Sequence, residues 1–174
     1  ARTIDEGYPP LTVDLITEQL AACGLAAGQT VLVHSALSRL GWVTGGPVAV
    51  VQALLRVLTP TGTLMMPTHT GDNSEPSYWQ NPPVPETWWP IIREHSPAFD
   101  PATAPTRMMG AIVECFRCWP GVLRSAHPTC SFAALGPHAA FLTNDHRLES
   151  ALGEHSPLAR LYDLDGDILL LGVD

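Results

Sequence analysis

Helical and strand periodicity alternate along this chain of 174 residues, and that alternation limits the possible folds more than any other feature. Apolar residues every three or four positions predict a helix after Thr12, which Gly24 ends. A strand is predicted at 30–34, a helix over 48–58 and a second strand at 63–66. Helices that alternate with strands predict a layered α/β domain.

The second half of the chain continues this pattern after a long break. Residues 67–105 have no periodicity and are rich in Pro and Trp. Because aromatic side chains supply buried area, we expect a structured excursion over the surface instead of disorder. Beyond it we predict a helix over 107–116, strands near 123–125 and 131–135, helical pieces near 137–144 and 156–164, and a strand at 167–174. The last segment is typical of a core strand cut off at its end, so we expect residues 1–174 to be the N-terminal portion of a single domain.

The charge balance excludes several classes of partner. All 9 basic residues are arginines, and 17 acidic residues bring the formal net charge to −8. A protein of this charge is not expected to bind nucleic acid or an anionic membrane. No apolar run reaches the roughly 18–20 residues of a membrane-spanning helix, and the N-terminus lacks the apolar core of a signal peptide. We therefore expect a cytoplasmic protein.

The sequence does not favour a metal site. The seven histidines lie singly, without the spacing that places two ligands on one helical face. Cys115 and Cys118 form a single C-x-x-C, which we interpret as two small apolar residues on a helix. The absence of any lysine excludes ordinary P-loop and Schiff-base chemistry, and there is no G-x-S-x-G elbow.

The end of the first strand is the first candidate site. Ligands of open α/β sheets collect at the carboxyl ends of strands, where backbone N–H groups can receive an anion. Hydroxyl groups at Ser35 and Ser38, with Arg39 nearby, would suit a pyrophosphate. The alternative is a strand end followed by helix-capping serines.

The exit of the second strand is the second candidate site. His69, Asp72 and Glu75 follow it, and carboxylates there could pair with the ammonium groups of a cationic substrate. A polar loop with solvated carboxylates is the alternative. Two further histidines could have a functional or a structural role. His127 is fixed before a proline and could contact a ligand or a neighbouring backbone group. His155 precedes a predicted helix start, where a neutral imidazole is favoured.

Taken together, these segments resemble the aminoglycoside 3-N-acetyltransferase family. The similarity runs in order along nearly the whole chain and rests on the segments 33–41 (VHSALSRLG), 60–67 (PTGTLMMP), 99–103 (FDPAT), 124–128 (RSAHP), 131–136 (SFAALG), 155–157 (HSP) and 169–173 (LLLGV). The resemblance implies the three-layer α/β/α sandwich with a mixed sheet found in antibiotic N-acetyltransferases, acetyl-coenzyme A as cosubstrate, no metal, and acetylation of the 3-amino group of 2-deoxystreptamine aminoglycosides. Antibiotic resistance would be the consequence.

The resemblance also implies roles for individual residues. The coenzyme-binding positions are His34, Ser35, Ala36, Leu37, Arg107, Ser131 and Phe132. The substrate-binding positions are Asp72, Glu75 and Tyr78, the last at the start of a Pro- and Trp-rich stretch that could shape which aminoglycosides fit.

The catalytic base is expected outside the given sequence. The family's signature, an Asn-Thr-x-Leu-His-x-Ala-Glu run, follows the last strand, and its His is the expected base, with His155 and His127 as supporting candidates here. Two alternatives remain: a coenzyme A-binding module without turnover, and an N-acetyltransferase of the same family that acts on a different amine. The expected assembly is a monomer or a homodimer.

Overall fold

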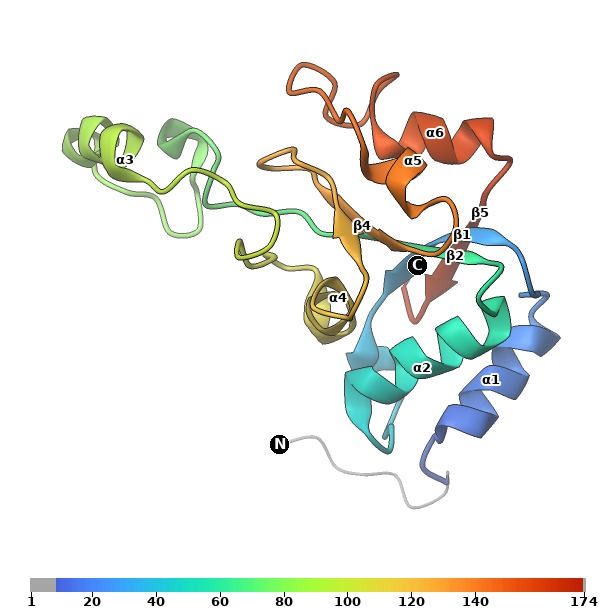
Figure 1. The fold of residues 1–174 in the computed structure, drawn as a ribbon. Helices are drawn as coiled ribbons and strands as arrows, with labels where there is room; N and C mark the ends of the chain where they lie inside the picture. The colour runs from blue at the N-terminus through green and yellow to red at the C-terminus, as the bar shows by residue number, and fades with distance from the viewer. Residues whose placement is uncertain (1–8, 174) are drawn as a thin grey trace.

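A five-stranded mixed sheet organises residues 9–173, the part of the chain that this computed structural model describes (Figure 1). The strands are β1 (Thr30–Ser35), β2 (Thr63–Pro67), β3 (Leu123–Arg124), β4 (Phe132–Leu135) and β5 (Asp167–Leu171). Their order across the sheet is β3-β4-β2-β1-β5; β1 is parallel to β2 and β5, and β4 is antiparallel to β2 and β3. The predicted mixed sheet is therefore confirmed.

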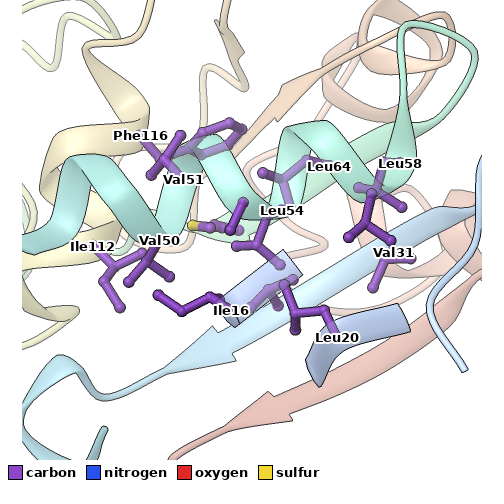
Figure 2. Close-up of a cluster of buried hydrophobic side chains, with 14 of the residues drawn as sticks. Ile16, Leu20, Val31, Val50, Val51, Leu54, Leu58, Leu64, Ile112 and Phe116 are labelled. Carbon is purple, nitrogen blue, oxygen red and sulfur yellow. The ribbon is translucent and has the colours of Figure 1, made fainter. Parts of the chain in front are cut away.

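Three helices cover one face of the sheet. They are α1 (Val13–Ala22), α2 (Gly46–Leu58) and α4 (Gly110–Arg117). Their apolar faces meet around Leu54, which is fully buried between Val31 of β1 and Phe116 of α4 (Figure 2). Burying each such side chain contributes roughly 1.5–3 kcal/mol, so this cluster stabilises the layer strongly. No helix within residues 9–173 is long and apolar enough to cross a membrane.

Two shorter helices cover the opposite face. They are α5 (Ala139–Thr143) and α6 (Pro157–Asp163). Leu142 and Leu161 from these helices pack against Leu32, Met65 and Phe132 of the sheet. Together with the first layer they complete the α/β/α sandwich that the sequence predicts.

The helix starts follow the capping residues that the sequence predicts. The Thr12 hydroxyl accepts a hydrogen bond from the Leu15 N–H at 3.2 Å, and Ser156 accepts one from Leu158 N–H at 3.2 Å at the start of α6. The start of α4 differs from the prediction, because Met108 (φ +60°) and Gly110 (φ +86°) interrupt the helical backbone. The helix therefore begins at Gly110 instead of residue 107.

Strand β5 lies at an edge of the sheet and is covered on only one face. Its Leu169 and Leu171 pack against the layer of α1, α2 and α4. Ile168 and Leu170 point the other way and are 63% and 56% exposed. The predicted strand is confirmed over Asp167–Leu171, whereas the predicted place in the core is wrong for one of its faces; Asp174 lies outside the described residues.

The segment between β2 and α4 leaves the body of the sheet and returns to it. It contains two single-turn elements, η2 (Pro76–Tyr78) and η3 (Glu86–Trp88), and the helix α3 (Trp89–His95). Figure 1 shows α3 far from the sheet, joined to it by two stretches of chain. The predicted structured excursion is confirmed, although the sequence pattern did not indicate α3. We call residues 68–105 the excursion.

Candidate functional site

The end of β1 forms a turn that is held by backbone hydrogen bonds. Ser35 ends the strand, and the Ala36 N–H donates to the Leu171 carbonyl of β5 at 2.9 Å. Ala36 has an extended backbone, and the single-turn element η1 (Leu37–Arg39) follows it. The Arg39 N–H donates to the Ala36 carbonyl at 2.9 Å. The turn is therefore fixed at the carboxyl edge of the two parallel strands.

A pocket of about 1510 Å³ opens beside this turn. Ser35, Ala36 and Leu37 line it, as the sequence predicts for a ligand site, whereas His34 is not among its lining residues. Its apolar wall comes from the turn, α1 and the start of α4, and consists of Leu11, Leu15, Leu37, Leu40, Trp42, Val43, Met108 and Met109. The Ser35 Oγ atom is buried and has no hydrogen-bond partner in the structure. Buried hydroxyls without a partner are uncommon in folded proteins, so Ser35 has hydrogen-bonding capacity that the described residues do not use.

A second wall of the pocket, at the start of α4, contributes Met108 and Met109 to this apolar lining, and neither residue was identified from the sequence. Met108 is 93% exposed and lies in the left-handed region, as does Gly110. A Cβ atom on Gly110 would lie 3.8 Å from the Ser35 carbonyl oxygen, so the two walls approach closely there. The only sequence signal for this wall is Gly110, a glycine inside the helix predicted over 107–116.

Asp72 and Arg107 lie together, although they are predicted for different ligands. Arg107 Nη1 lies 3.0 Å from Asp72 Oδ1, and Nη2 donates to the Asn81 carbonyl at 3.0 Å. The Arg107 N–H also donates to the carbonyl of His69 at 2.9 Å. Arg107 therefore connects the two ends of the excursion, and the segment that follows it forms the pocket wall.

Glu75 also has an arginine partner. Arg93 of α3 donates to both carboxylate oxygens, at 2.5 and 3.2 Å. These hydrogen bonds hold the pKa of Glu75 below its usual value. Tyr78 is 78% exposed at the end of η2. All three predicted substrate residues therefore lie on the excursion, and both carboxylates are already paired.

Ser131 and Phe132 are buried at the start of β4. The Ser131 hydroxyl donates to the Thr68 carbonyl at 2.8 Å. Phe132 is 2% exposed and packs in the layer of α5 and α6. Neither lines the pocket, so their predicted contact with a coenzyme remains a prediction.

His69 follows the end of β2, and His34 lies near the end of the parallel strand β1, so both histidines lie at the carboxyl edge of these strands. Its ring meets the edge of Phe132 at 5.3 Å between centroids, and its Nε2 atom is buried without a hydrogen-bond partner. Burial lowers the pKa of His69, and the nearby rings of His34, His127 and His146 lower it further. Both effects favour the neutral form of the His69 imidazole.

His127 forms hydrogen bonds with the backbone of residues 129–130 and of Leu148. Its Nδ1 atom accepts from the backbone N–H groups of Cys130 at 3.0 Å and Thr129 at 3.2 Å. Nδ1 must therefore be unprotonated, and Nε2 donates to the Leu148 carbonyl at 3.3 Å. The structure thus favours the backbone alternative for His127.

His146 stacks on His127 and was not identified from the sequence. The two ring centroids are 4.6 Å apart. Its nitrogens lie 3.0 Å from Ser125 Oγ and 2.9 Å from the Ala151 carbonyl. His155, the other supporting candidate, is exposed, and only its backbone N–H is engaged, with Ser150 Oγ at 3.3 Å.

The cysteines are free thiols. Cys115 is partly buried against the core, and burial raises its pKa, whereas Cys118 is exposed just beyond α4. In the described part of the chain, no group of three or more His, Cys, Asp or Glu side chains is arranged to hold a metal ion.

A sandwich with a large pocket at the carboxyl edge of its parallel strands is typical of ligand-binding α/β proteins, and comparison with known proteins identifies the family. The model of the family described as aminoglycoside 3-N-acetyltransferase matches residues 32–174. The chain therefore belongs to the aminoglycoside 3-N-acetyltransferase family.

Three relatives illustrate the similarity. The SPbeta prophage-derived aminoglycoside N(3')-acetyltransferase-like protein YokD of Bacillus subtilis (strain 168) is 54% identical over 166 residues, which cover 95% of this chain and 61% of that protein. Its crystal structure superposes with a TM-score of 0.94 at 53% identity, over 96% of this chain and 62% of that one. AAC-IIIb in a binary complex with CoASH (36% identity) and AAC-VIa bound to sisomicin (35%) each give a TM-score of 0.81 over 93% of this chain and 59% of theirs. The chain thus spans about three fifths of the length of these relatives.

Proposed function

We propose that this chain forms the coenzyme-binding part of an enzyme that transfers the acetyl group of acetyl-coenzyme A to the 3-amino group of 2-deoxystreptamine aminoglycosides, which gives antibiotic resistance. The observation that carries the proposal is the pocket beside the turn after β1, where the buried Ser35 Oγ lacks a partner. We also infer a cytoplasmic protein that acts as a monomer or homodimer; the four free thiols support that location.

The pocket suits a long ligand with an anionic end. The guanidinium of Arg39, which lines the pocket, favours phosphate groups, and the apolar wall favours a thin, flexible chain such as pantetheine. The complex of AAC-IIIb with CoASH supports the assignment. Bound there, the coenzyme would supply the acetyl thioester, while Ser35, Ala36 and Leu37 would hold and orient it.

We assign the aminoglycoside to the side of the excursion. Aminoglycosides are polycations, so a protein with a net charge of −8 attracts them. Asp72, Glu75 and Tyr78 are the proposed contacts, and the complex of AAC-VIa with sisomicin supports a substrate of this class. Because both carboxylates already bind arginines, an incoming ammonium group would share or displace Arg107 and Arg93.

The reaction requires a base near the amine. An ammonium group has no lone pair with which to attack a thioester, so one proton must leave before the new C–N bond forms. We propose, as the family resemblance implies, that the histidine of the Leu-His-x-Ala-Glu run performs this step. Within this chain, His127 cannot accept a proton at Nδ1 without losing two hydrogen bonds.

The chain is further proposed to be the N-terminal portion of a single domain. The relatives are longer, and the exposed face of β5 carries Ile168 and Leu170. An apolar strand face of this kind is usually covered. Adding the following codons of the gene should raise the thermal midpoint of unfolding, whereas an unchanged midpoint would count against the assignment.

A coupled assay tests the proposed activity. Thiol release from acetyl-coenzyme A is measured with gentamicin or kanamycin. The assay uses the 174-residue chain and a longer protein that also includes the residues encoded by the following codons of the gene. Release that depends on the drug supports the proposal. If calorimetry shows coenzyme binding but neither protein releases thiol, the result contradicts the proposed activity and supports the first alternative, a coenzyme A-binding module without turnover.

A different amine substrate is the second candidate function. The arginine partners of Asp72 and Glu75 favour it, because they reduce the free negative charge offered to a polycation. Expression of the full gene in a sensitive host decides between the substrates: growth on gentamicin supports drug acetylation, and unchanged sensitivity supports another amine.

A further inference from the structure

Arg124 of β3 connects parts of the chain that are far apart in sequence. Its Nε atom donates to Thr68 Oγ1 and to Ser131 Oγ, both at 3.1 Å, and its Nη2 atom donates to the Thr68 carbonyl at 2.7 Å. Its Nη1 atom donates to the carbonyls of Pro101, at 3.2 Å, and Ala104. The planar guanidinium thus reaches three separate segments at once.

The acceptors of this guanidinium are neutral oxygens. Across residues 9–173, no carboxylate forms an ion pair with Arg124. The ring of Phe99 lies 5.2 Å from the guanidinium carbon, which adds a cation–π contact. Burial, and to a lesser extent Arg117, lowers the pKa of Arg124 to about 10, so it is still charged at pH 7. Holding this charge without a counterion is costly, and its several hydrogen bonds offset the cost.

The bonded segments are the two ends of the excursion. Thr68 begins it directly after β2, whereas Phe99, Pro101 and Ala104 lie near its end. Figure 1 shows these two stretches running between the sheet and α3. Asp72 lies between them, near the Thr68 end. A shift of either end would therefore move the loop that carries the acidic side chains.

We propose that Arg124 is a positioning residue that holds both ends of the excursion against β3 and β4 and thereby sets the place of the Asp72–Glu75 loop. The consequence for substrate rests on the proposed function; the anchoring of the excursion does not. A lysine cannot replace it, because an ammonium group has three donors on one atom, whereas the guanidinium has five donors spread over a planar fork.

Trypsin digestion of the folded protein tests the anchoring without any activity. Arg93 is the only arginine in the excursion, and the chain has no lysine, so cleavage after Arg93 reports opening of this segment. In Arg124→Lys we expect cleavage there to be about tenfold faster than in wild type. A rate equal to that of wild type would overturn the proposal.

Arg160 provides the matched control. It also donates to carbonyls, those of Phe141 at 3.1 Å and Asp145 at 3.3 Å, and it lies 5.9 Å from the Phe141 ring. It touches α5 and not the excursion, so Arg160→Lys should leave cleavage after Arg93 unchanged. Equal acceleration in both variants would show a general loss of stability and overturn the proposal.

Phe99→Leu covers the case in which Arg124→Lys does not fold. It removes the aromatic contact at the far end of the excursion and leaves both core clusters intact. We expect cleavage after Arg93 to be about threefold faster. An unchanged rate in Phe99→Leu would then contradict the anchoring.

Steady-state kinetics of the extended enzyme test the link to substrate. In Arg124→Lys we expect the KM for the aminoglycoside to rise about tenfold, while the KM for acetyl-coenzyme A stays within about twofold. An equal rise in the two KM values would contradict a role of Arg124 that is confined to the Asp72–Glu75 loop. If wild type transfers no acetyl group, the proposed function fails, and the trypsin data alone decide the anchoring.

Discussion

Arg107 and Asp72 form an ion pair at 3.0 Å that ties the acidic loop of the excursion to the wall of the pocket. The Arg107 backbone bonds to His69 at the end of the sheet, and Met108 and Met109 line the pocket next to it. A residue predicted for the coenzyme and a residue predicted for the substrate are thus in direct contact. The two proposed ligand regions are therefore connected through Arg107.

Asp72→Asn should weaken aminoglycoside binding and leave coenzyme A binding nearly unchanged. The substitution removes one negative charge from the loop, and its geometry otherwise stays the same. We expect a rise of about three- to tenfold in the dissociation constant of the aminoglycoside, equivalent to about 0.7–1.4 kcal/mol. Calorimetric titration with each ligand measures this; equal losses for both ligands would point to misfolding instead.

The stability contribution of the same ion pair should be small. Because both side chains are largely exposed, solvent screens the interaction, and a double-mutant cycle of Asp72→Asn with Arg107→Gln should give a coupling free energy below about 1 kcal/mol. Urea unfolding of the four proteins provides the measurement. A coupling of several kcal/mol would mean that the pair is far more buried than the structure shows.

Phe132→Ala should destabilise the fold strongly. The ring is 2% exposed between β4 and the layer of α5 and α6, so its removal leaves a cavity and should cost about 3–5 kcal/mol of unfolding free energy. Trp88→Ala, at a side chain that is 54% exposed on the excursion, is the control and should change it by less than about 0.5 kcal/mol. Urea unfolding compares the two, and similar losses would contradict the assigned packing.

The unfolding free energy should fall as pH decreases from 8 to 5.5. Burial is the main cause that lowers the pKa of His69 and of His146 below 6.5 in the folded protein. Between the folded and unfolded pKa values the unfolded state binds more protons, so stability is complete above pH 6.5 and decreases below it. Each histidine contributes a slope of at most about 1.4 kcal/mol per pH unit.

Urea unfolding at several pH values measures this slope. His69→Gln removes one titrating ring whose pKa is lowered in the folded protein, so it should reduce the slope. The range stays above pH 5.5 to exclude Glu114. Its pKa is lowered to about 2 in the folded protein, mainly by Arg117, so its contribution to stability is complete above the unfolded value of 4.5 and is lost as the pH falls below it. A slope that is equal in wild type and His69→Gln would contradict the assignment to His69.

Local sequence signals predicted the elements well, because their causes are local. Thr12 and Ser156 cap helices, and the apolar residues of 30–34 and 63–66 form buried parallel strands. These outcomes depend on capping and periodicity over a few residues. The predicted helix start at residue 107 was wrong, because Met108 adopts a positive φ that its residue type does not indicate and α4 begins at Gly110.

The partners of the candidate residues could not be predicted in the same way. Asp72 and Arg107 are 35 residues apart, and nothing in their spacing indicates a contact. The bonds of Arg124 to Thr68 likewise depend on β2 and β3 flanking β4 in the sheet. Contacts between residues so far apart in sequence depend on the order of the strands in the sheet. The sequence therefore indicates which residues are candidates for the site but not which of them contact one another.

Calorimetric titration of coenzyme A into wild type and Ser35→Trp tests the central claim most directly. The new ring would occupy the pocket beside the turn after β1, where the Ser35 Oγ atom now lacks a partner. We predict saturable binding to wild type and at least about tenfold weaker binding to Ser35→Trp, with the unfolding midpoint of the variant confirming that it folds. Equal affinity in the two folded proteins would contradict the account, because the coenzyme would then bind elsewhere.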